Sequence, residues 1–113
     1  MHELVIVEGI LETVIPAVQE HDVSRILAIH LKIGELSGIV PSCIHEYFSI
    51  ASAGTIAEGA KIIIENTPIR IHCPDCGKDG IIQKGQYACP ACGSPRFRIT
   101  SGREYYVESV EAE

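Results

Sequence analysis

The sequence predicts an α+β fold in which two helices pack on a three-stranded sheet and a zinc-ribbon module is inserted between two of the strands. Three observations lead to this prediction. Apolar residues recur at helical spacing over residues 4–20, and side chains alternate between two faces over residues 24–34. The pattern Cys-Pro-x-Cys-Gly occurs twice, at residues 73–77 and 89–93, which is typical of a small metal-binding module.

The first helix is expected over residues 4–20, because its apolar side chains fall on one face of a helix. These side chains are Leu4, Val7, Leu11, Val14, Ile15 and Val18. The β-branched start, residues 4–7, could instead form a strand. Pro16 lacks an amide hydrogen and crowds the preceding turn, so a kink or a break is expected near Glu12.

The next segments predict a strand, a loop and a second helix. Over residues 24–34, alternation places Leu27, Ile29, Leu31 and Ile33 on one face of a half-buried strand. Residues 34–38 are expected to form a loop. Pro41 suits the first turn of a helix, and Gly54 ends it. The apolar stripe of this helix consists of Ile44, Tyr47, Phe48 and Ala51.

Two further strands are expected at residues 61–66 and 103–110, with the metal-binding module between them. The predicted division is therefore residues 1–67 plus 101–113 as one domain and residues 68–100 as the zinc-binding domain. Residues 68–70 and 99–102 would form the neck of the inserted module. Within the module, the segments on either side of Gly85 suggest a short hairpin between the two cysteine pairs.

The two cysteine pairs are expected to bind one metal ion. Four thiolates are the tetrahedral set that structural zinc prefers, and they come from Cys73, Cys76, Cys89 and Cys92. Redox pairs, disulfides and a four-thiolate iron site are the alternatives, of which iron has the same ligands. The fifth cysteine, Cys43, is interpreted as a small buried hydrophobe. His72 precedes the first pair, and it could replace a thiolate or couple the site to pH.

Composition and charge limit the classes of partner. The chain has 113 residues and a formal net charge of −6. Residues 68–100 carry an excess of three positive charges and the rest an excess of nine negative ones, so a nucleic acid is a poor partner. No apolar run has the length of about 20 residues that a membrane span needs. No signal peptide is recognised, which indicates a cytoplasmic protein. We expect a protein partner or a cation.

The first three residues form a second candidate site. A retained Met1 would place its amine beside the His2 imidazole. The Met1 amine, the deprotonated amide of His2 and His2 Nδ1 can close two chelate rings, which leaves a fourth position for Glu3 or a partner's donor. Planar nitrogen donors suit Ni²⁺ and Cu²⁺ better than Zn²⁺. The alternative is that the terminus frays and that Glu3 only favours the first helical turn.

Several motifs together resemble the HypA/HybF family of hydrogenase maturation factors, and the resemblance covers the whole chain. They are Met1-His2-Glu3-Leu4, Ile33-Gly34-Glu35-Leu36-Ser37-Gly38, Gly54-Thr55, Glu58-Gly59-Ala60, the two Cys-Pro-x-Cys-Gly patterns, Gly102-Arg103-Glu104 and Glu108-Ser109-Val110-Glu111. The resemblance implies a nickel metallochaperone that holds Ni²⁺ through His2 and adjacent backbone nitrogens and binds zinc structurally. It also implies that nickel is transferred to the hydrogenase large subunit with the help of a partner GTPase and that, in some organisms, the family also acts in the maturation of urease.

Ligand exchange rather than catalysis is the expected activity, so the chain is not predicted to be an enzyme. Two other functions stay open at this point. One is a zinc-ribbon adaptor that contacts only protein, and the other is an iron–thiolate redox protein. The chain could be a monomer or a homodimer, since a long hairpin neck would permit strand exchange.

Overall fold

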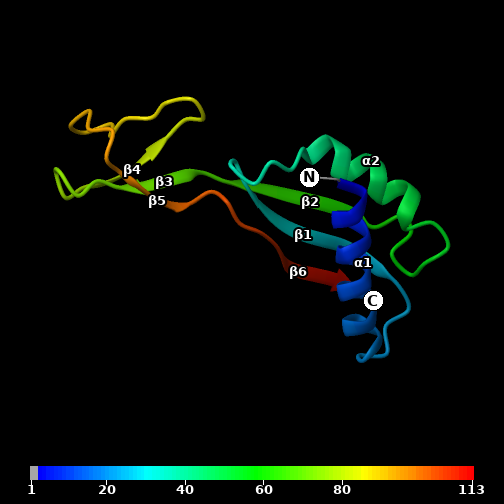
Figure 1. Ribbon diagram of the computed structural model, residues 1–113. Helices are drawn as coiled ribbons and strands as arrows, with labels where there is room; N and C mark the ends of the chain where they lie inside the picture. The colour runs from blue at the N-terminus through cyan, green and yellow to red at the C-terminus, as the bar shows by residue number, and fades with distance from the viewer. Residues whose placement is uncertain (1–2) are drawn as a thin grey trace. The chain divides into compact units, whose positions relative to one another are not determined.

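A computed structural model describes residues 3–113, so the expectations for Met1 and His2 lie outside the described residues. There are two helices, α1 (Glu3–Gln19) and α2 (Pro41–Ala51). The strands are β1 (Ile26–Gly34), β2 (Lys61–Thr67), β3 (Ile69–His72), β4 (Asp79–Ile82), β5 (Arg98–Ser101) and β6 (Tyr105–Ala112). They form two three-stranded sheets with the orders β2-β1-β6 and β4-β3-β5 (Figure 1). The predicted α+β fold with two helices is confirmed.

The chain divides into two compact units. The first contains the chain up to Leu31, Ile39–Ile64 and Val107–Glu113, and the second contains Lys32–Gly38 and Glu65–Tyr106. The sequence-based division into a nickel-binding and a zinc-binding domain assigns residues to metal ions, and it stays a prediction.

The core of the first unit lies between the helices and one face of the sheet. Helix α1 contacts α2, and Figure 1 shows both helices beside β1 and β2. The buried side chains of the helices are Ile6, Val7, Ile10, Leu11 and Val14 from α1, and Ile44 and Phe48 from α2. A stripe of this kind removes apolar area from water, and the polar faces of both helices stay exposed.

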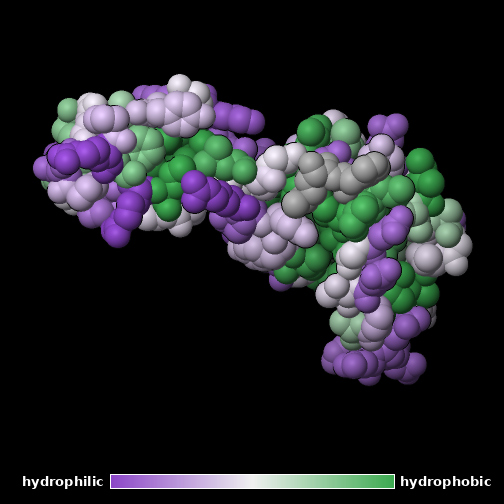
Figure 2. All heavy atoms as spheres, in the orientation of Figure 1, coloured by the Kyte–Doolittle hydropathy of each residue, from purple (hydrophilic) through white to green (hydrophobic). Residues whose placement is uncertain are grey.

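The helix predicted over residues 4–20 is confirmed, because α1 spans Glu3–Gln19, and two of the alternatives for it are excluded. It is helical from Glu3, so the alternative of a strand at residues 4–7 is wrong. It also continues through Pro16 to Gln19, so no break occurs near Glu12. Both Pro16 and Glu12 are exposed, and water can therefore satisfy the carbonyl group that the proline leaves without a donor. In Figure 2 hydrophilic residues cover the end of α1 farther from α2.

Strand β1 alternates as predicted but changes phase in its middle. Ile26 and Ala28 are buried, and so are Ile29 and the two alternate residues after it, whereas Leu27 is 37% exposed. The predicted face that grouped Leu27 with Ile29 is therefore wrong. Such a shift by one residue is typical of a strand that accommodates an extra residue, and a strict alternation rule cannot foresee it.

In the second unit, β3 is the central strand. It pairs antiparallel with β4 and with β5. The predicted hairpin around Gly85 is wrong, because β4 pairs with β3 and no strand is found between Ile82 and Arg98 among these described residues. The core of the unit consists of Ile69, Ile71, Cys73, Ile82 and Cys89, against which Leu36, Phe97 and Ile99 pack.

A hydrogen-bonded node connects three segments of the second unit. The carboxylate of Glu104 accepts hydrogen bonds from the Thr67 hydroxyl and the Gly102 amide, each 2.9 Å long. The Gly34 amide donates to the carbonyl of Glu104 at 2.7 Å, and the Leu36 amide donates to the carbonyl of Gly102 at 2.7 Å. The loop predicted at residues 34–38 and the neck segment that ends at Gly102 therefore meet at one point.

The node predicts a pH dependence of stability. The hydrogen bond from the Gly102 amide, with smaller contributions from the amide of Glu104 itself and from Thr67, lowers the pKa of Glu104. A lowered native pKa stabilises the fold above the ordinary glutamate pKa of about 4.3, and this contribution is lost as pH falls through the native value. We expect the free energy of unfolding, measured in urea, to fall less steeply below about pH 4.3 in Glu104→Gln than in wild type. Glu12→Gln on the exposed face of α1 is the charge-matched control, and equal slopes in wild type and Glu104→Gln would contradict the expectation.

Candidate metal centre

The structure brings four cysteine sulfur atoms together. Cys73, Cys76, Cys89 and Cys92 have sulfur atoms that all lie within 4.8 Å of one another, and no other group of three or more potential metal ligands is found in residues 3–113. The Cys73–Cys92 and Cys76–Cys89 sulfur distances are 3.6 and 3.7 Å. A tetrahedral zinc ion with Zn–S bonds of about 2.3 Å would place its ligands about 3.8 Å apart. The cysteine cluster therefore fits a zinc ion, and all four thiols are free of disulfide bonds.

The two Cys-Pro-x-Cys-Gly turns have the same local construction. In the first, the amide of Gly77 donates to the carbonyl of Cys73 at 2.7 Å, and in the second, Gly93 donates to Cys89 at 2.8 Å. Both glycines have positive φ, 74° and 79°, which an L side chain adopts only with strain. The glycine therefore closes each turn and leaves both of its thiols on one side.

Backbone hydrogen bonds, desolvation and the neighbouring thiols move the pKa values of Cys89 and Cys92 in opposite directions. A hydrogen bond from the backbone of Cys92 is the main cause that lowers the pKa of Cys89 to about 7. The backbone of Ser94 lowers the pKa of Cys92, but desolvation and the neighbouring thiols outweigh it and raise that pKa to about 12. The Cys89 thiol thus ionises readily, whereas the Cys92 thiol resists ionisation. A dication would remove this conflict, because it stabilises all four thiolates at once.

An ionic contact ties the two turns together. Asp75, inside the first turn, accepts a short hydrogen bond from the Ser94 hydroxyl just after the second turn. Arg96 Nη2 donates to the same carboxylate at 2.9 Å. The Ser94 hydrogen bond is the main cause that lowers the pKa of Asp75, and the Arg96 guanidinium acts in the same direction. These three residues were not predicted from the sequence, since only their positions inside or directly after the cysteine patterns could have indicated them.

The sequence also singled out His72 and Cys43, and neither belongs to the cysteine cluster. His72 Nδ1 lies 2.6 Å from the Asp79 carboxylate, so this ring nitrogen is engaged beside the cluster. Cys43, expected to be buried, is only partly buried on α2 and is not part of the cluster.

Of the predicted nickel-binding residues, only Glu3 lies in the described part of the chain. It is the first residue of α1, where a carboxylate interacts favourably with the helix dipole. The other two, Met1 and His2, lie outside the described residues. The tripeptide therefore leads directly into a helix.

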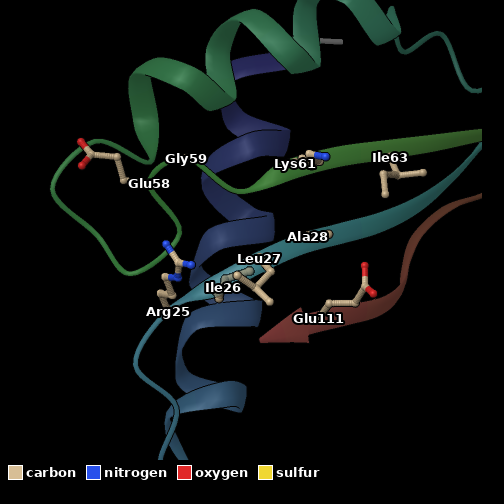
Figure 3. Close-up of a pocket in the computed structure, with 9 residues that line it drawn as sticks. All are labelled: Arg25, Ile26, Leu27, Ala28, Glu58, Gly59, Lys61, Ile63 and Glu111. Carbon is tan, nitrogen blue, oxygen red and sulfur yellow. The ribbon is translucent and has the colours of Figure 1, made fainter. Parts of the chain in front are cut away.

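A hollow of about 530 Å³ lies on the exposed side of the first unit's sheet (Figure 3). Its charged groups are engaged in part, because Arg25 pairs with Glu113 at 2.7 Å and Glu111 pairs with His30 at 3.0 Å. In Figure 3 the labelled residues spread along β1, β2, β6 and the loop before β2, and their side chains do not converge on one point. This arrangement resembles a solvated sheet face more than a binding site. In residues 3–113, no helix has the length and apolar character needed to cross a membrane.

Comparison with known proteins identifies the family. Residues 1–112 match the family described as "Hydrogenase/urease nickel incorporation, metallochaperone, hypA". The hydrogenase maturation factor HypA of Chloroflexus aurantiacus is 38% identical over 112 residues, which cover 98% of each chain. The HypA of Geobacter metallireducens is 37% identical over 113 residues, which cover 100% of each chain.

Solved structures support the same fold. The solution structure of the nickel metallochaperone HypA from Helicobacter pylori matches with a TM-score of 0.65 and 22% identity, over 99% of this chain and 97% of that one. A second solution structure of a HypA protein matches with a TM-score of 0.73 and 23% identity, over 100% and 97%. From the full-length family match and these relatives, the chain belongs to the HypA family of nickel-incorporation metallochaperones for hydrogenase maturation.

Proposed function

We propose that this protein binds Ni²⁺ at its N-terminus and delivers it for maturation of a nickel-containing hydrogenase. The ligands are the Met1 amine, the amide and Nδ1 of His2, and a fourth donor for which Glu3 is the nearest candidate. The observation that carries the proposal is the full-length match to a nickel-incorporation family together with a histidine at the second position. Since the family description names urease as well, urease is a second possible recipient.

Delivery proceeds by ligand exchange. Two fused chelate rings keep the ion from bulk water, while a planar set of nitrogen donors leaves the ion open to an incoming ligand above the plane. The acceptor's donors can therefore bind before the protein's donors leave. Because the amine and the imidazole must be deprotonated to bind, nickel affinity should fall as pH drops below neutrality. No catalytic step is needed, and we propose that the protein is not an enzyme.

We also propose that Cys73, Cys76, Cys89 and Cys92 bind a structural zinc ion. The sulfur spacing of 3.6–3.7 Å supports this, and zinc bound by four thiolates would cross-link the two turns and neutralise their charge. A site closed by four protein ligands leaves no open position for a substrate. The cysteines and their backbone amides thus hold the second unit in shape.

The partners and location follow from the same proposal. We propose that the protein works in the cytoplasm with the nickel-handling GTPase of the maturation pathway and with the hydrogenase large subunit. The domain division then assigns nickel to residues 1–67 plus 101–113 and zinc to residues 68–100. A monomer and a homodimer are both compatible with this function.

Calorimetry of Ni²⁺ binding tests the terminal site. We expect nickel affinity to fall in His2→Ala and in a chain extended by one residue before Met1. Each change removes a direct ligand, so the loss should exceed the roughly 10–100-fold that follows when only a residue supporting a ligand is removed. His45→Ala, on the exposed side of α2, is the matched control and should bind nickel as wild type does. Equal affinity in all four proteins would exclude the N-terminal chelate and would favour an adaptor function.

A further inference from the structure

The two units carry opposite charge. The second unit has seven basic and five acidic side chains, whereas the first has ten acidic and two basic ones. The acidic side chains of the second unit do not pair with all of its basic ones, because the guanidinium groups of Arg70 and Arg98 form no ion pair or hydrogen bond with any described residue.

Both arginines lie on one face of the β4-β3-β5 sheet. The inner face of this sheet carries the buried side chains of Ile69, Ile71 and Ile82. The outer face consists of Arg70, His72, Asp79, Ile81, Arg98 and Thr100. Arg70 is opposite Ile81 in the β3–β4 register, and Arg98 is opposite His72 in the β3–β5 register. Directly opposed residues of antiparallel strands project to the same side of the sheet.

The outer face combines charge with exposed apolar surface. Ile81 is 48% exposed, and a hollow of about 470 Å³ is lined by Arg70, Asp79, Ile81 and Thr100. The one acid on this face, Asp79, is engaged by His72 at 2.6 Å. What remains available is a row of one apolar side chain and two arginines. Arginine and exposed apolar groups together are typical of protein interfaces.

We propose that the outer face of β4-β3-β5 docks an extended acidic segment of a partner protein. Arg70 and Arg98 are diagonal neighbours on adjacent strands. Such neighbours lie about 7–8 Å apart, and alternate residues of an extended chain are separated by about 7 Å. Two carboxylates at alternate positions of the segment therefore match the two guanidinium groups, and an apolar residue precedes them on the side of Ile81, which lies directly opposite Arg70. Each carboxylate accepts hydrogen bonds from one guanidinium, and the apolar residue covers Ile81.

A nucleic acid fits this surface less well than a protein segment does. Only two free arginines lie on the face, whereas nucleic-acid affinity rises with the number of phosphates neutralised. The first unit has a net charge of −8 and would repel a long polyanion more strongly than a short segment with two carboxylates. The inference does not depend on nickel binding.

Fluorescence anisotropy with the full-length, zinc-loaded protein tests the proposal. The probe is a labelled peptide in which Val, Glu and Glu occupy alternate positions separated by Ser. We expect the Kd to rise about fivefold in Arg70→Gln and in Arg98→Gln, and further in the double variant. Higher ionic strength should also weaken binding. Lys84→Gln, which removes an exposed charge between the two cysteine pairs, is the matched control and should bind as wild type does.

Zinc content and circular dichroism of each variant establish that the fold is intact. Three outcomes would overturn the proposal. In the first, the peptide does not bind the wild-type protein, or its affinity is unchanged by replacing its two Glu residues with Gln or by replacing both arginines of the protein. In another, a labelled single-stranded oligonucleotide binds more tightly than the peptide at the same ionic strength. In the third, light scattering shows a dimer that the double variant disrupts, which would make a second copy of the chain the occupant.

Discussion

Replacing Cys73 with serine is expected to unfold the second unit of the protein and to leave the first unit folded. Cys73 is fully buried and belongs to a core of only five buried residues, two of which are cysteines. Structural zinc contributes about 10–16 kcal/mol to the folding of small zinc-dependent peptides, which is as much as a whole domain's stability. On the proposal that zinc binds at this cluster, Cys73→Ser removes a ligand together with the ion, and the remaining core has too little buried area to compensate.

Amide hydrogen exchange is the measurement for this prediction. Protection of the β3 amides at residues 69–72 should be lost in Cys73→Ser, while protection in α1, whose buried residues form their own core with α2, should persist. Cys43→Ser is the matched control, because Cys43 lies outside the cysteine cluster. Slow exchange in β3 after removal of the metal would contradict the structural role. Elemental analysis of the wild-type protein separates zinc from iron in the same site.

Gly34→Ala is expected to destabilise the protein by about 3 kcal/mol or more. A Cβ atom at Gly34 would lie 2.1 Å from the carbonyl oxygen of Gly102 and 2.3 Å from its carbonyl carbon. Both atoms belong to the backbone of Gly102, which has a φ of 118°. A Cβ atom added at Gly102 would itself lie 3.1–3.4 Å from atoms of Pro68 and Ile69, so the backbone of Gly102 is closely packed on its other side as well. Neither side can therefore move without breaking the hydrogen bonds around Glu104.

The opposite result is expected from the same substitution in α1. Gly9 is exposed within the helix, and a Cβ atom there has no heavy atom within 4 Å. Gly9→Ala should stabilise the protein by about 0.5–1 kcal/mol, since alanine loses less backbone entropy in a helix. Urea unfolding of both variants gives the comparison. A loss of less than about 1 kcal/mol in Gly34→Ala would mean that the close approach is not maintained in solution.

Patterns that depend on neighbouring residues could be predicted from the sequence, and long-range pairings could not. The spacing of apolar residues located both helices, since helical periodicity is a local property. The paired cysteine patterns located the residues that cluster, because each turn is built from five consecutive residues. By contrast, β4 pairs with β3 rather than within a hairpin around Gly85, and such a choice depends on which apolar faces meet in the core.

Compensation by the surroundings explains the remaining differences. Pro16 does not break α1, because it lies on the exposed side where water can reach the unpaired carbonyl group. The role of Gly34 depends on a backbone segment 68 positions away in the sequence, around Gly102. Asp75 acquires its role only when the second turn brings Ser94 and Arg96 beside it. These contacts join segments that are far apart in the sequence, so local patterns do not predict them.

The matched construction of the two cysteine turns has a consequence for metal selectivity. The glycines and backbone amides fix the four sulfur atoms at the separations of a tetrahedron. Ni²⁺ favours a flat coordination plane, so entry into this cluster would require both turns to deform. On the proposal that nickel binds at the N-terminus, the geometry of the turns would favour zinc over nickel in the cluster and would keep the two metal ions at separate sites.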